Sequence, residues 1–305
     1  MEVDGVRFID LKTVKASKSF FALYKLLKQE KPHTVFSTTA NINILVSMVA
    51  IFIKGTRFIA RASNIASELI QYEDTKTRFY EFFTRFSYGV FNQIVCQTKD
   101  MQDALVKRYA LDANKTKVIH NPLLDTDKIK TENIADTKFR LVVVARFSPE
   151  KGLERLIDIL AELPPNYSLS MVGIGVQKEL ITRKIEALNL TSRVEFYGEV
   201  RDVQQIMLDH DLLVLSSYTE GFPNVVIEAL AVGLPVVSFK VSGINEIIKE
   251  GFNGYIVPQN NISSFKEKIV EACTNRTWNS QDIKADVYSK FNLNKISKAY
   301  EKLIN

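Results

Sequence analysis

Short apolar runs alternate with helix-like segments along most of this chain. After residue 140 the runs occupy residues 141–145, 169–173, 194–198, 212–217 and 235–239. Each is followed by a segment with helical spacing of apolar residues. Continuous runs rich in Val, Leu and Ile are typical of strands that are buried on both faces of a parallel sheet. The alternation therefore predicts a doubly wound α/β domain.

The first part of the chain repeats this alternation less completely. Its strand-like runs occupy residues 6–11, 33–38, 57–61, 93–97 and 117–121, and its helix-like segments occupy residues 17–30, 41–53, 71–88 and 98–109. A polar stretch that starts at an Asn-Pro turn signal follows them. We therefore expect a linker at 123–138 between domains 1–122 and 139–305. Both domains should be Rossmann-like, with parallel sheets that face a crevice and bind ligands at the carboxyl ends of their strands.

Composition excludes several classes of protein. A content of 46% hydrophobic and 25% charged residues is that of a globular protein. The two cysteines, Cys96 and Cys273, can build neither a disulfide framework nor a metal cage, which fits a reducing cytoplasm. The N-terminus lacks the pattern of a signal peptide. The longest apolar run, residues 42–53, is about half the length that crosses a bilayer. We expect a cytoplasmic protein.

Positive charge is concentrated in the first domain. Residues 1–122 hold 18 Lys+Arg against 11 Asp+Glu, or +7, whereas the remainder holds 22 against 24, or −2. Such an excess suits an anionic partner, such as a membrane surface, a phosphorylated acceptor or nucleic acid. Ordinary solvated lysines would explain the same numbers.

The loops that follow the predicted strands of the second domain carry charges and glycines. After the first strand comes "RFSPEKG", in which Arg146 and Lys151 flank a turn that leads into a helix. Two cations and a helix N-terminus can bind a diphosphate, although a solvated turn with incidental charges is the alternative. Gly173 and Gly175 follow the second strand, where a simple tight turn is the simpler interpretation. Gly198 follows the third and would allow close approach of a flat group such as a base.

The stretch "EGFPNVVIEALAVGLPVV" follows the fourth strand. It predicts a helix from about Pro223 to Val232 that stops at Gly233. Glu220 then precedes the helix N-terminus, whose free N–H groups are arranged for an anion. Glu228 lies more than one turn inside the helix and could accept hydrogen bonds from a vicinal diol such as ribose. Alternatively, Glu220 only caps the helix and Glu228 forms a salt bridge.

The second domain resembles the retaining, nucleotide-sugar-dependent glycosyltransferases of family 4, which have the GT-B fold. The matching pieces occur in the family's order and cover about residues 139–258: "RFSPEKG", "VGIG", "VEFYGEV", "SSYTEGFPNVVIEALAVGLPVV" and "GINEIIKEGFNGYIV". The first domain matches more loosely, through "KPHTVFSTT", "ARASN" and "VIHNP", and is similar to members that extend lipid-linked or surface polysaccharides.

The resemblance implies a role for each matching residue. Arg146 and Lys151 would bind the donor's phosphates, and Glu228 the ribose hydroxyls. Glu220 would contact the donor sugar and distal phosphate together with the backbone of Gly221, Phe222, Pro223 and Asn224. Gly173 would belong to the cofactor-binding loops, and Tyr197, Gly198 and Val200 would line the base. The donor, with UDP expected, is a co-substrate, and neither a cofactor nor a metal is required. The "DTD" at 125–127 resembles a metal motif of another fold and carries little weight.

The first domain departs from the family pattern. Family members begin with a strand, a glycine-rich loop and a helix, whereas this sequence starts at "VRFIDL", so the N-terminal domain is expected to be incomplete. Arg61 and Asn64 of "RASN" are the weak acceptor-side candidates, and a structural salt bridge explains Arg61 equally well.

We therefore expect transfer of a hexose or N-acetylhexosamine from a nucleoside diphosphate sugar to a lipid-linked or surface glycan, and no binding of nucleic acid. The basic first domain, with its aromatic stretch 77–91, would suit an acceptor held at the anionic inner face of the plasma membrane, and a core helix would explain the aromatics about as well. A truncated, non-catalytic nucleotide-sugar-binding fragment or partner subunit is the alternative.

Overall fold

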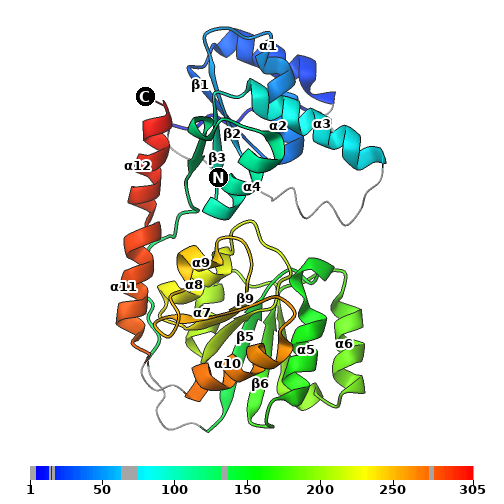
Figure 1. Ribbon diagram of the computed structural model, residues 1–305, viewed down its shortest axis with the longest axis vertical. Coiled ribbons are helices and arrows are strands. Elements are labelled where there is room, and N and C mark those ends of the chain that lie inside the picture. Colours follow the sequence, from blue (N-terminus) through cyan, green and yellow to red (C-terminus); the bar gives the residue numbers. More distant parts are fainter. Residues whose placement is uncertain are drawn as a thin grey trace. The chain divides into compact units, whose positions relative to one another are not determined.

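A computed structural model describes residues 5–13, 15, 18–62, 75–131, 137–274 and 278–304, with only the backbone of residues 75–81 (Figure 1). The chain forms two compact units. Unit 1 comprises residues 1–119 and 303–305, and unit 2 comprises residues 120–302. Residues 123–131 pack with unit 2, where Leu123 N–H donates to the Phe291 carbonyl (2.7 Å) and Lys130 N–H to that of Val232 (2.7 Å).

Unit 1 contains a parallel sheet in the order β1-β2-β3-β4. Its strands are β1 (Thr34–Thr38), β2 (Arg57–Arg61), β3 (Gln93–Cys96) and β4 (Thr116–Val118). Its helices are α1 (Phe20–Glu30), α2 (Ala40–Ala50), α3 (Thr75–Val90) and α4 (Lys99–Tyr109). Apolar side chains from these helices and from β2 and β3 form one buried cluster that includes Leu27, Val49, Phe58, Phe91 and Leu105. Parallel strands connected by helices were predicted from the sequence and are confirmed.

The predicted strand at residues 6–11 is wrong, because this segment belongs to neither sheet. Five of its six residues are exposed, and Phe8 retains 70% of its accessible surface. The local content of Val, Phe, Ile and Leu is strand-like, but a strand also needs a neighbouring strand to satisfy its backbone groups. A polar contact holds the segment to α1 instead, since Arg7 pairs with Glu30 (2.6 Å).

Unit 2 contains a six-stranded parallel sheet in the order β10-β9-β8-β5-β6-β7. The strands are β5 (Phe139–Val144), β6 (Tyr167–Val172), β7 (Val194–Gly198), β8 (Leu212–Leu215), β9 (Val236–Phe239) and β10 (Gly254–Val257). The helices are α5 (Leu153–Glu162), α6 (Lys178–Ala187), α7 (Val203–Leu208), α8 (Asn224–Ala231), α9 (Ile244–Ile247), α10 (Ile262–Thr274), α11 (Ser280–Phe291) and α12 (Leu293–Ile304). This strand order is that of a dinucleotide-binding, doubly wound sheet.

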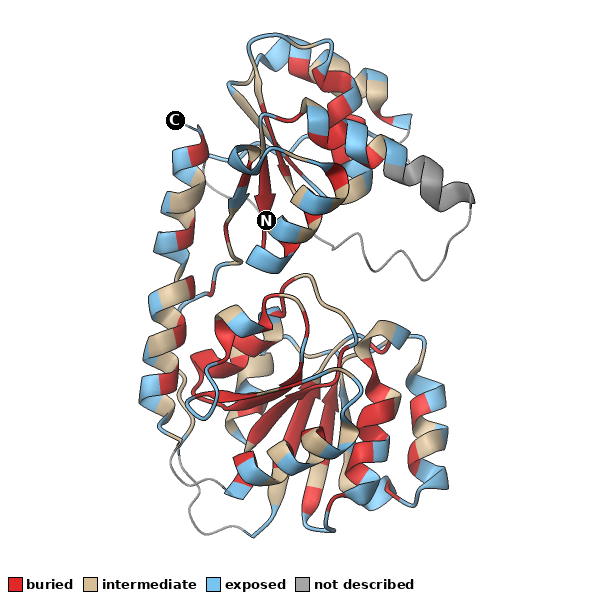
Figure 2. Ribbon diagram, in the orientation of Figure 1, coloured by how far each residue is buried: buried red, intermediate tan, exposed pale blue. Residues whose placement is uncertain are grey.

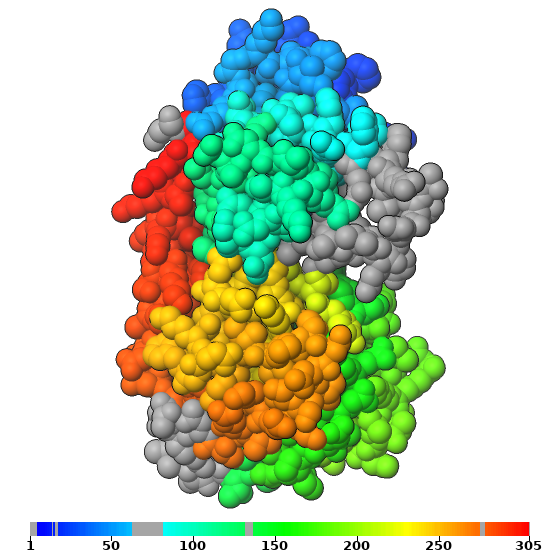
Figure 3. Space-filling model, in the orientation of Figure 1, coloured from blue at the N-terminus to red at the C-terminus, as the bar shows by residue number. Residues whose placement is uncertain are grey.

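The central strands of unit 2 are buried on both faces (Figure 2). In β5, Leu141 and Val143 pack on one face with α5, α6 and α10, whereas Val142 packs on the other with α7, α8 and α11. The orange side chains of α10 and the green side chains of α5 and α6 lie on the visible face of unit 2 in Figure 3. Burial on both faces explains why the sequence shows continuous apolar runs rather than alternation.

Candidate active site

The direction of winding in the unit 2 sheet reverses between β5 and β8. The chain continues from β5 to β6 and β7 on one side, and from β8 to β9 and β10 on the other. The loops that leave the carboxyl ends of β5 and β8 therefore diverge around a common space, which is where ligands bind in open α/β sheets. These loops are residues 145–152 and 216–223, and they contain the charged residues that the sequence singled out.

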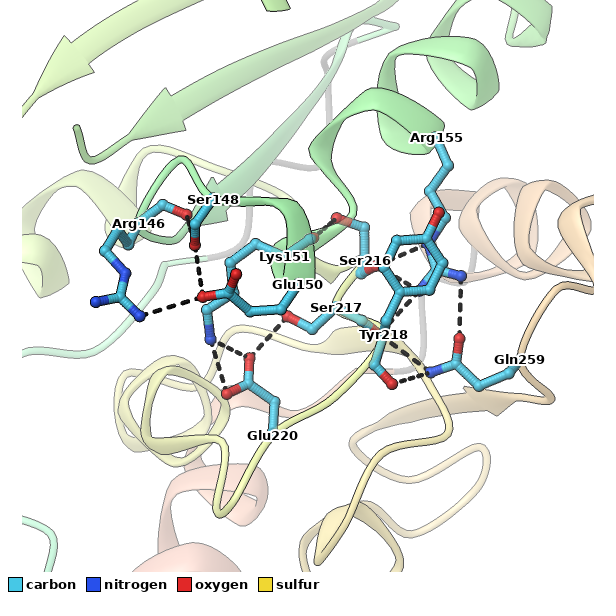
Figure 4. A network of polar contacts seen from close by, with 10 residues as sticks. All are labelled: Arg146, Ser148, Glu150, Lys151, Arg155, Ser216, Ser217, Tyr218, Glu220 and Gln259. Carbon is cyan, nitrogen blue, oxygen red and sulfur yellow. Dashed lines mark hydrogen bonds and ion pairs between the residues drawn. The ribbon is translucent and has the colours of Figure 1, made fainter. Parts of the chain in front are cut away.

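Lys151 and Glu220 form an ion pair across this reversal point (Figure 4). Lys151 Nζ donates to both carboxylate oxygens of Glu220, at 2.8 and 2.9 Å. The side chains are only 18% and 13% exposed, so solvent screens the pair weakly. The Ser217 hydroxyl donates to Glu220 Oε1 at 2.7 Å and fixes the carboxylate further. Glu220 thus does not cap α8, whose N-terminus has no side-chain cap.

Close backbone packing holds the β5 and β8 loops together. Gly152 ends the short 3₁₀ helix η4 (Pro149–Lys151) with φ +58°, and a Cβ there would lie 2.3 Å from the Ser216 carbonyl oxygen. Tyr218 N–H donates to the Glu150 carbonyl at 2.9 Å, and the Ser216 hydroxyl donates to the Lys151 carbonyl at 2.9 Å. The two loops therefore behave as one element.

Arg146 lies on the same loop but is directed to a different acid. Its Nη2 donates to Glu150 Oε1 at 3.1 Å, and the Arg146 side chain is 73% exposed. The Ser148 hydroxyl also donates to Glu150 Oε1 at 2.6 Å. Burial would raise the pKa of Glu150, but the hydrogen bonds from Ser148 and Arg146 outweigh it and lower that pKa below its ordinary value. An exposed guanidinium in a weak surface pair can move to another anion at little cost.

The glycine loop after β6 packs directly against the β5 loop. A Cβ on Gly173 would lie 1.9 Å from the Ala145 carbonyl oxygen, and one on Gly175 would lie 2.3 Å from that of Phe147. Gly173 N–H donates to the Gly198 carbonyl at 2.7 Å, and Gly198 itself has φ +69°. Gly173 and Gly175 are thus required for close approach of the β5 and β6 loops, which is more than the simple tight turn considered from the sequence.

Helix α8 begins one residue after Pro223, close to the predicted start. Asn224 N–H is used within the turn, where it donates to the Phe222 carbonyl at 2.9 Å. The N–H groups of Gly221, Phe222 and Val225 donate no hydrogen bond to any other described residue. Free N–H groups at a helix N-terminus favour a bound anion. The Phe222 side chain is buried and anchors this turn in the core.

Glu228 lies within α8 and is partly buried. In the described part of the chain its carboxylate has neither a hydrogen-bond nor an ion-pair partner, so the salt bridge considered from the sequence is absent there. Burial raises the pKa of Glu228 above its ordinary value of 4.5. An unpaired, partly desolvated carboxylate is costly to keep, and it is ready to accept hydrogen bonds from a ligand.

We expect Glu228→Gln to stabilise the protein at pH 7 and, if this carboxylate binds the ribose as the resemblance implies, to weaken UDP binding about tenfold, as for a lost charge-assisted hydrogen bond. The folded-state pKa is raised, so the ionised carboxylate removes stability as pH rises through and above 4.5. Melting temperatures of both proteins between pH 4 and 8 would check the first effect, and calorimetry with UDP the second. A variant that is less stable at pH 7 and binds UDP normally would contradict this role.

The other predicted site residues lie in several places. Tyr197 is 41% exposed at the end of β7, where its hydroxyl donates to Glu195 at 3.1 Å, and Val200 packs against the core on the α8 side of the sheet. Arg61 ends β2 in unit 1, and its carbonyl accepts from Asn43 (3.2 Å). Asn64 lies outside the described residues.

Sequence reasoning missed four residues that surround the Lys151–Glu220 pair. Ser216 and Ser217 follow β8 directly, and Arg155 and Gln259 bind the same loop from α5 and from the end of β10. Ser216 and Ser217 shortly precede Glu220 in the sequence, and this spacing could have indicated a hydroxyl partner for the carboxylate. Arg155 gave none, because an arginine in an amphipathic helix normally faces solvent.

Among the described residues there is no group of three or more His, Cys, Asp or Glu side chains placed to hold a metal ion. Within those same ranges, every helix is too short or too polar to cross a bilayer.

Comparison with known proteins gives one family. The family described as Glycosyl transferases group 1 matches residues 125–288, which is more than half of the chain. The chain is 24% identical over 302 residues to the UDP-Gal:alpha-D-GlcNAc-diphosphoundecaprenol alpha-1,3-galactosyltransferase of Escherichia coli, with 93% of this chain and 78% of that protein covered. It is 25% identical over 248 residues to the GalNAc-alpha-(1->4)-GalNAc-alpha-(1->3)-diNAcBac-PP-undecaprenol alpha-1,4-N-acetyl-D-galactosaminyltransferase of Campylobacter jejuni, with 79% and 65% covered.

Solved structures show the same fold. The structure of Anabaena Alr3699/HepE in complex with UDP-glucose matches with a TM-score of 0.80 and 22% identity, over 93% of this chain and 81% of that one. The lipopolysaccharide outer core galactosyltransferase WaaB matches with a TM-score of 0.78 and 17% identity, over 94% and 79%. These likenesses support the GT-B fold that the sequence predicted.

Proposed function

Because the chain belongs to the Glycosyl transferases group 1 family, we propose that it transfers a hexose or N-acetylhexosamine from a nucleoside diphosphate sugar to a lipid-linked or surface glycan. The observation that carries this proposal is the Lys151–Glu220 pair at the reversal point of the unit 2 sheet. The β8–α8 segment also contains N–H groups and the Glu228 carboxylate, for which the described residues supply no partner.

The donor should lie along the carboxyl edge of the unit 2 sheet. Lys151, Arg146 and the N–H groups of Gly221 and Phe222 would bind the diphosphate. Glu228 would accept hydrogen bonds from the ribose, and Tyr197 with Gly198 would lie beside the base. Uridine is the expected base, since HepE was solved with UDP-glucose and the Escherichia coli relative is named for UDP-Gal.

The chemistry assigned to these residues is stabilisation of the leaving group. The bond between the sugar C1 and the diphosphate oxygen breaks as an acceptor hydroxyl oxygen bonds to C1 on the same face, with retention of configuration. The acceptor's proton leaves with the diphosphate. Negative charge develops on the diphosphate oxygen, and fixed donors aimed at that position lower the barrier. Glu220 holds Lys151 in place and contacts the sugar.

We assign the acceptor to unit 1, whose residues carry a net charge of +7, whereas the rest of the chain carries −2. The two relatives named above act on undecaprenol-linked glycans, which supports a lipid-linked acceptor. Such an acceptor lies at a membrane surface, so we place the protein in the cytoplasm, at the inner face of the plasma membrane. Arg61 is the described acceptor-side candidate.

The test is a transfer assay with a panel of UDP-hexoses and UDP-N-acetylhexosamines and undecaprenyl-diphosphate-linked mono- and disaccharides. We expect a glycan that is longer by one sugar, with an α linkage by NMR when the donor is α-linked. We expect this product to be lost in Glu220→Ala. Binding of UDP with no turnover of any donor would instead support a non-catalytic nucleotide-sugar-binding protein. An epimerised nucleotide sugar as product would show a different reaction.

We expect turnover to persist in EDTA. The groups assigned to the diphosphate are two cationic side chains and neutral backbone N–H donors, so we expect the leaving group not to depend on a divalent ion. Rates measured with and without EDTA, and after addition of Mn²⁺, would check this. Complete loss in EDTA that Mn²⁺ restores would contradict the assignment of Lys151 and Arg146.

A further inference from the structure

Arg155 of α5 is buried against the β8 loop that carries Glu220, with a relative exposure of 7%. All of its hydrogen bonds go to neutral oxygens. Nε donates to the Ser216 carbonyl (2.8 Å), Nη2 to the Ser217 carbonyl (2.8 Å) and Nη1 to Gln259 Oε1 (3.0 Å). None of the described carboxylates pairs with it. Burial lowers the pKa of Arg155 to about 10, so it remains a cation at neutral pH.

Two aromatic rings enclose the guanidinium. Its central carbon lies 3.9 Å from the centroid of the Tyr218 ring and 3.9 Å from that of Phe239. Stacking between two rings partly offsets the cost of removing a charge from water. Burying a cation without an anionic partner among the described residues nevertheless costs folding free energy. A role in the neighbouring site would explain why a cation lies at this core position.

The hydrogen bonds of Arg155 fix the backbone of the β8 loop, which carries Glu220 of the ion pair. They bind the carbonyls of Ser216 and Ser217, and the Ser217 hydroxyl in turn holds Glu220 (Figure 4). The Gln259 amide donates to the Ser217, Tyr218 and Lys240 carbonyls at 3.0–3.2 Å, so it extends the same support to the end of β9. Side chains from α5 and from the end of β10 thus hold three consecutive residues of the β8 loop.

We propose that Arg155 is a positioning residue for the transfer reaction: with Gln259 it sets the conformation of residues 216–218 so that Ser217 and Glu220 hold Lys151 against the donor diphosphate. This inference rests on the proposed function for its kinetic consequence, and on the contacts above for its structural one. Lysine cannot replace Arg155, because an ammonium group lacks the planar fork that reaches three acceptors and stacks between two rings.

The test compares Arg155→Met and Arg155→Lys with Arg193→Met. Arg193 is a matched control, because among the described residues it too donates to neutral oxygens, the backbone carbonyls of Leu160, Leu163, Pro164 and Tyr167. These lie at the opposite, amino end of the sheet, where β6 begins at Tyr167. We expect both Arg155 variants to lower kcat about 100-fold, as for a misplaced catalytic group. Arg193→Met should lower the melting temperature without this change.

A double-mutant cycle separates positioning from general loss of stability. If Arg155 acts through Glu220, Arg155→Met should cost less than about threefold in a Glu220→Gln background. An equal loss in both backgrounds, or a kcat for Arg155→Met like that of Arg193→Met, would overturn the inference. If Arg155→Met fails to fold, Gln259→Leu replaces it in the test. This variant removes part of the hydrogen bonding to the β8 loop, so we expect a smaller loss of kcat.

A crystal structure of the Arg155 variant provides a readout that does not depend on turnover. We expect the Lys151–Glu220 contact to open beyond the 4.0 Å of an ion pair and the Ser217–Glu220 bond to be lost. An intact pair in the variant would overturn the inference even if the wild-type protein transfers sugar. A wild-type protein that turns over no donor would refute the proposed function, and this structural comparison would still decide the role of Arg155.

Discussion

Lys151→Ala is expected to weaken the binding of UDP by about 1.5–3 kcal/mol, as for the loss of a charge-assisted contact. The same change should lower kcat/KM about 100- to 1,000-fold, because a fixed donor at the leaving group acts mainly in the transition state. Of the two cations assigned to the diphosphate, Lys151 is less exposed than Arg146. Its ammonium group also donates to both carboxylate oxygens of Glu220. Calorimetry with UDP and steady-state kinetics measure the two effects.

Removing Lys151 also leaves Glu220 poorly solvated and without its cation, which destabilises the protein by itself. The double variant Lys151→Ala/Glu220→Gln removes that secondary effect, so it should be more stable than Lys151→Ala and bind UDP no better. Lys184→Ala is the matched control, since Lys184 pairs with Asp158 on the surface of the same unit. Unchanged UDP affinity in Lys151→Ala would remove this residue from the site.

Gly152→Ala should destabilise unit 2 and abolish most transfer activity. The residue has φ +58°, where an alanine costs about 1–2 kcal/mol. Its Cβ would also meet the Ser216 carbonyl at 2.3 Å and Arg155 Nε at 2.8 Å, which adds about 1–3 kcal/mol of overpacking. Relief of the clash must move the β5 loop away from the β8 loop, and so separate Lys151 from Glu220. Denaturant unfolding and transfer rates measure the two consequences.

Gly251→Ala isolates the cost of the backbone conformation. Gly251 has φ +71° in the same unit, and a Cβ there would meet nothing within 4 Å. We expect this control to lose about 1–2 kcal/mol of stability and no activity. Equal stability losses in the two variants, with transfer retained in Gly152→Ala, would show that the close packing of the two loops is unimportant.

Much of the fold followed from the sequence because strands buried on both faces leave continuous apolar runs. Five of the six strands in unit 2 and all four in unit 1 lie at or near the predicted runs. β10 (Gly254–Val257) was not predicted, since it is four residues long and starts at a glycine. Residues 6–11 failed in the opposite way: the local pattern was strand-like, but a strand requires a paired neighbour that a local pattern cannot supply.

The site could be predicted as a set of loops but not as a set of contacts. Parallel strands bring their carboxyl ends to one edge, so the sequence could place Lys151 and Glu220 on that edge. It could not show that they pair with each other, nor that Glu228 lacks a partner among the described residues. Burial of Arg155 depends on rings from β9 and the β8 loop, which lie far away in the sequence.

The most direct test of the donor site is a crystal structure of the protein with UDP. We expect diphosphate oxygens within hydrogen-bond distance of Lys151 Nζ and of the N–H groups of Gly221 or Phe222, and ribose hydroxyls on the Glu228 carboxylate. UDP bound elsewhere, with the Lys151–Glu220 pair unchanged and Glu228 still without a partner, would contradict this expectation.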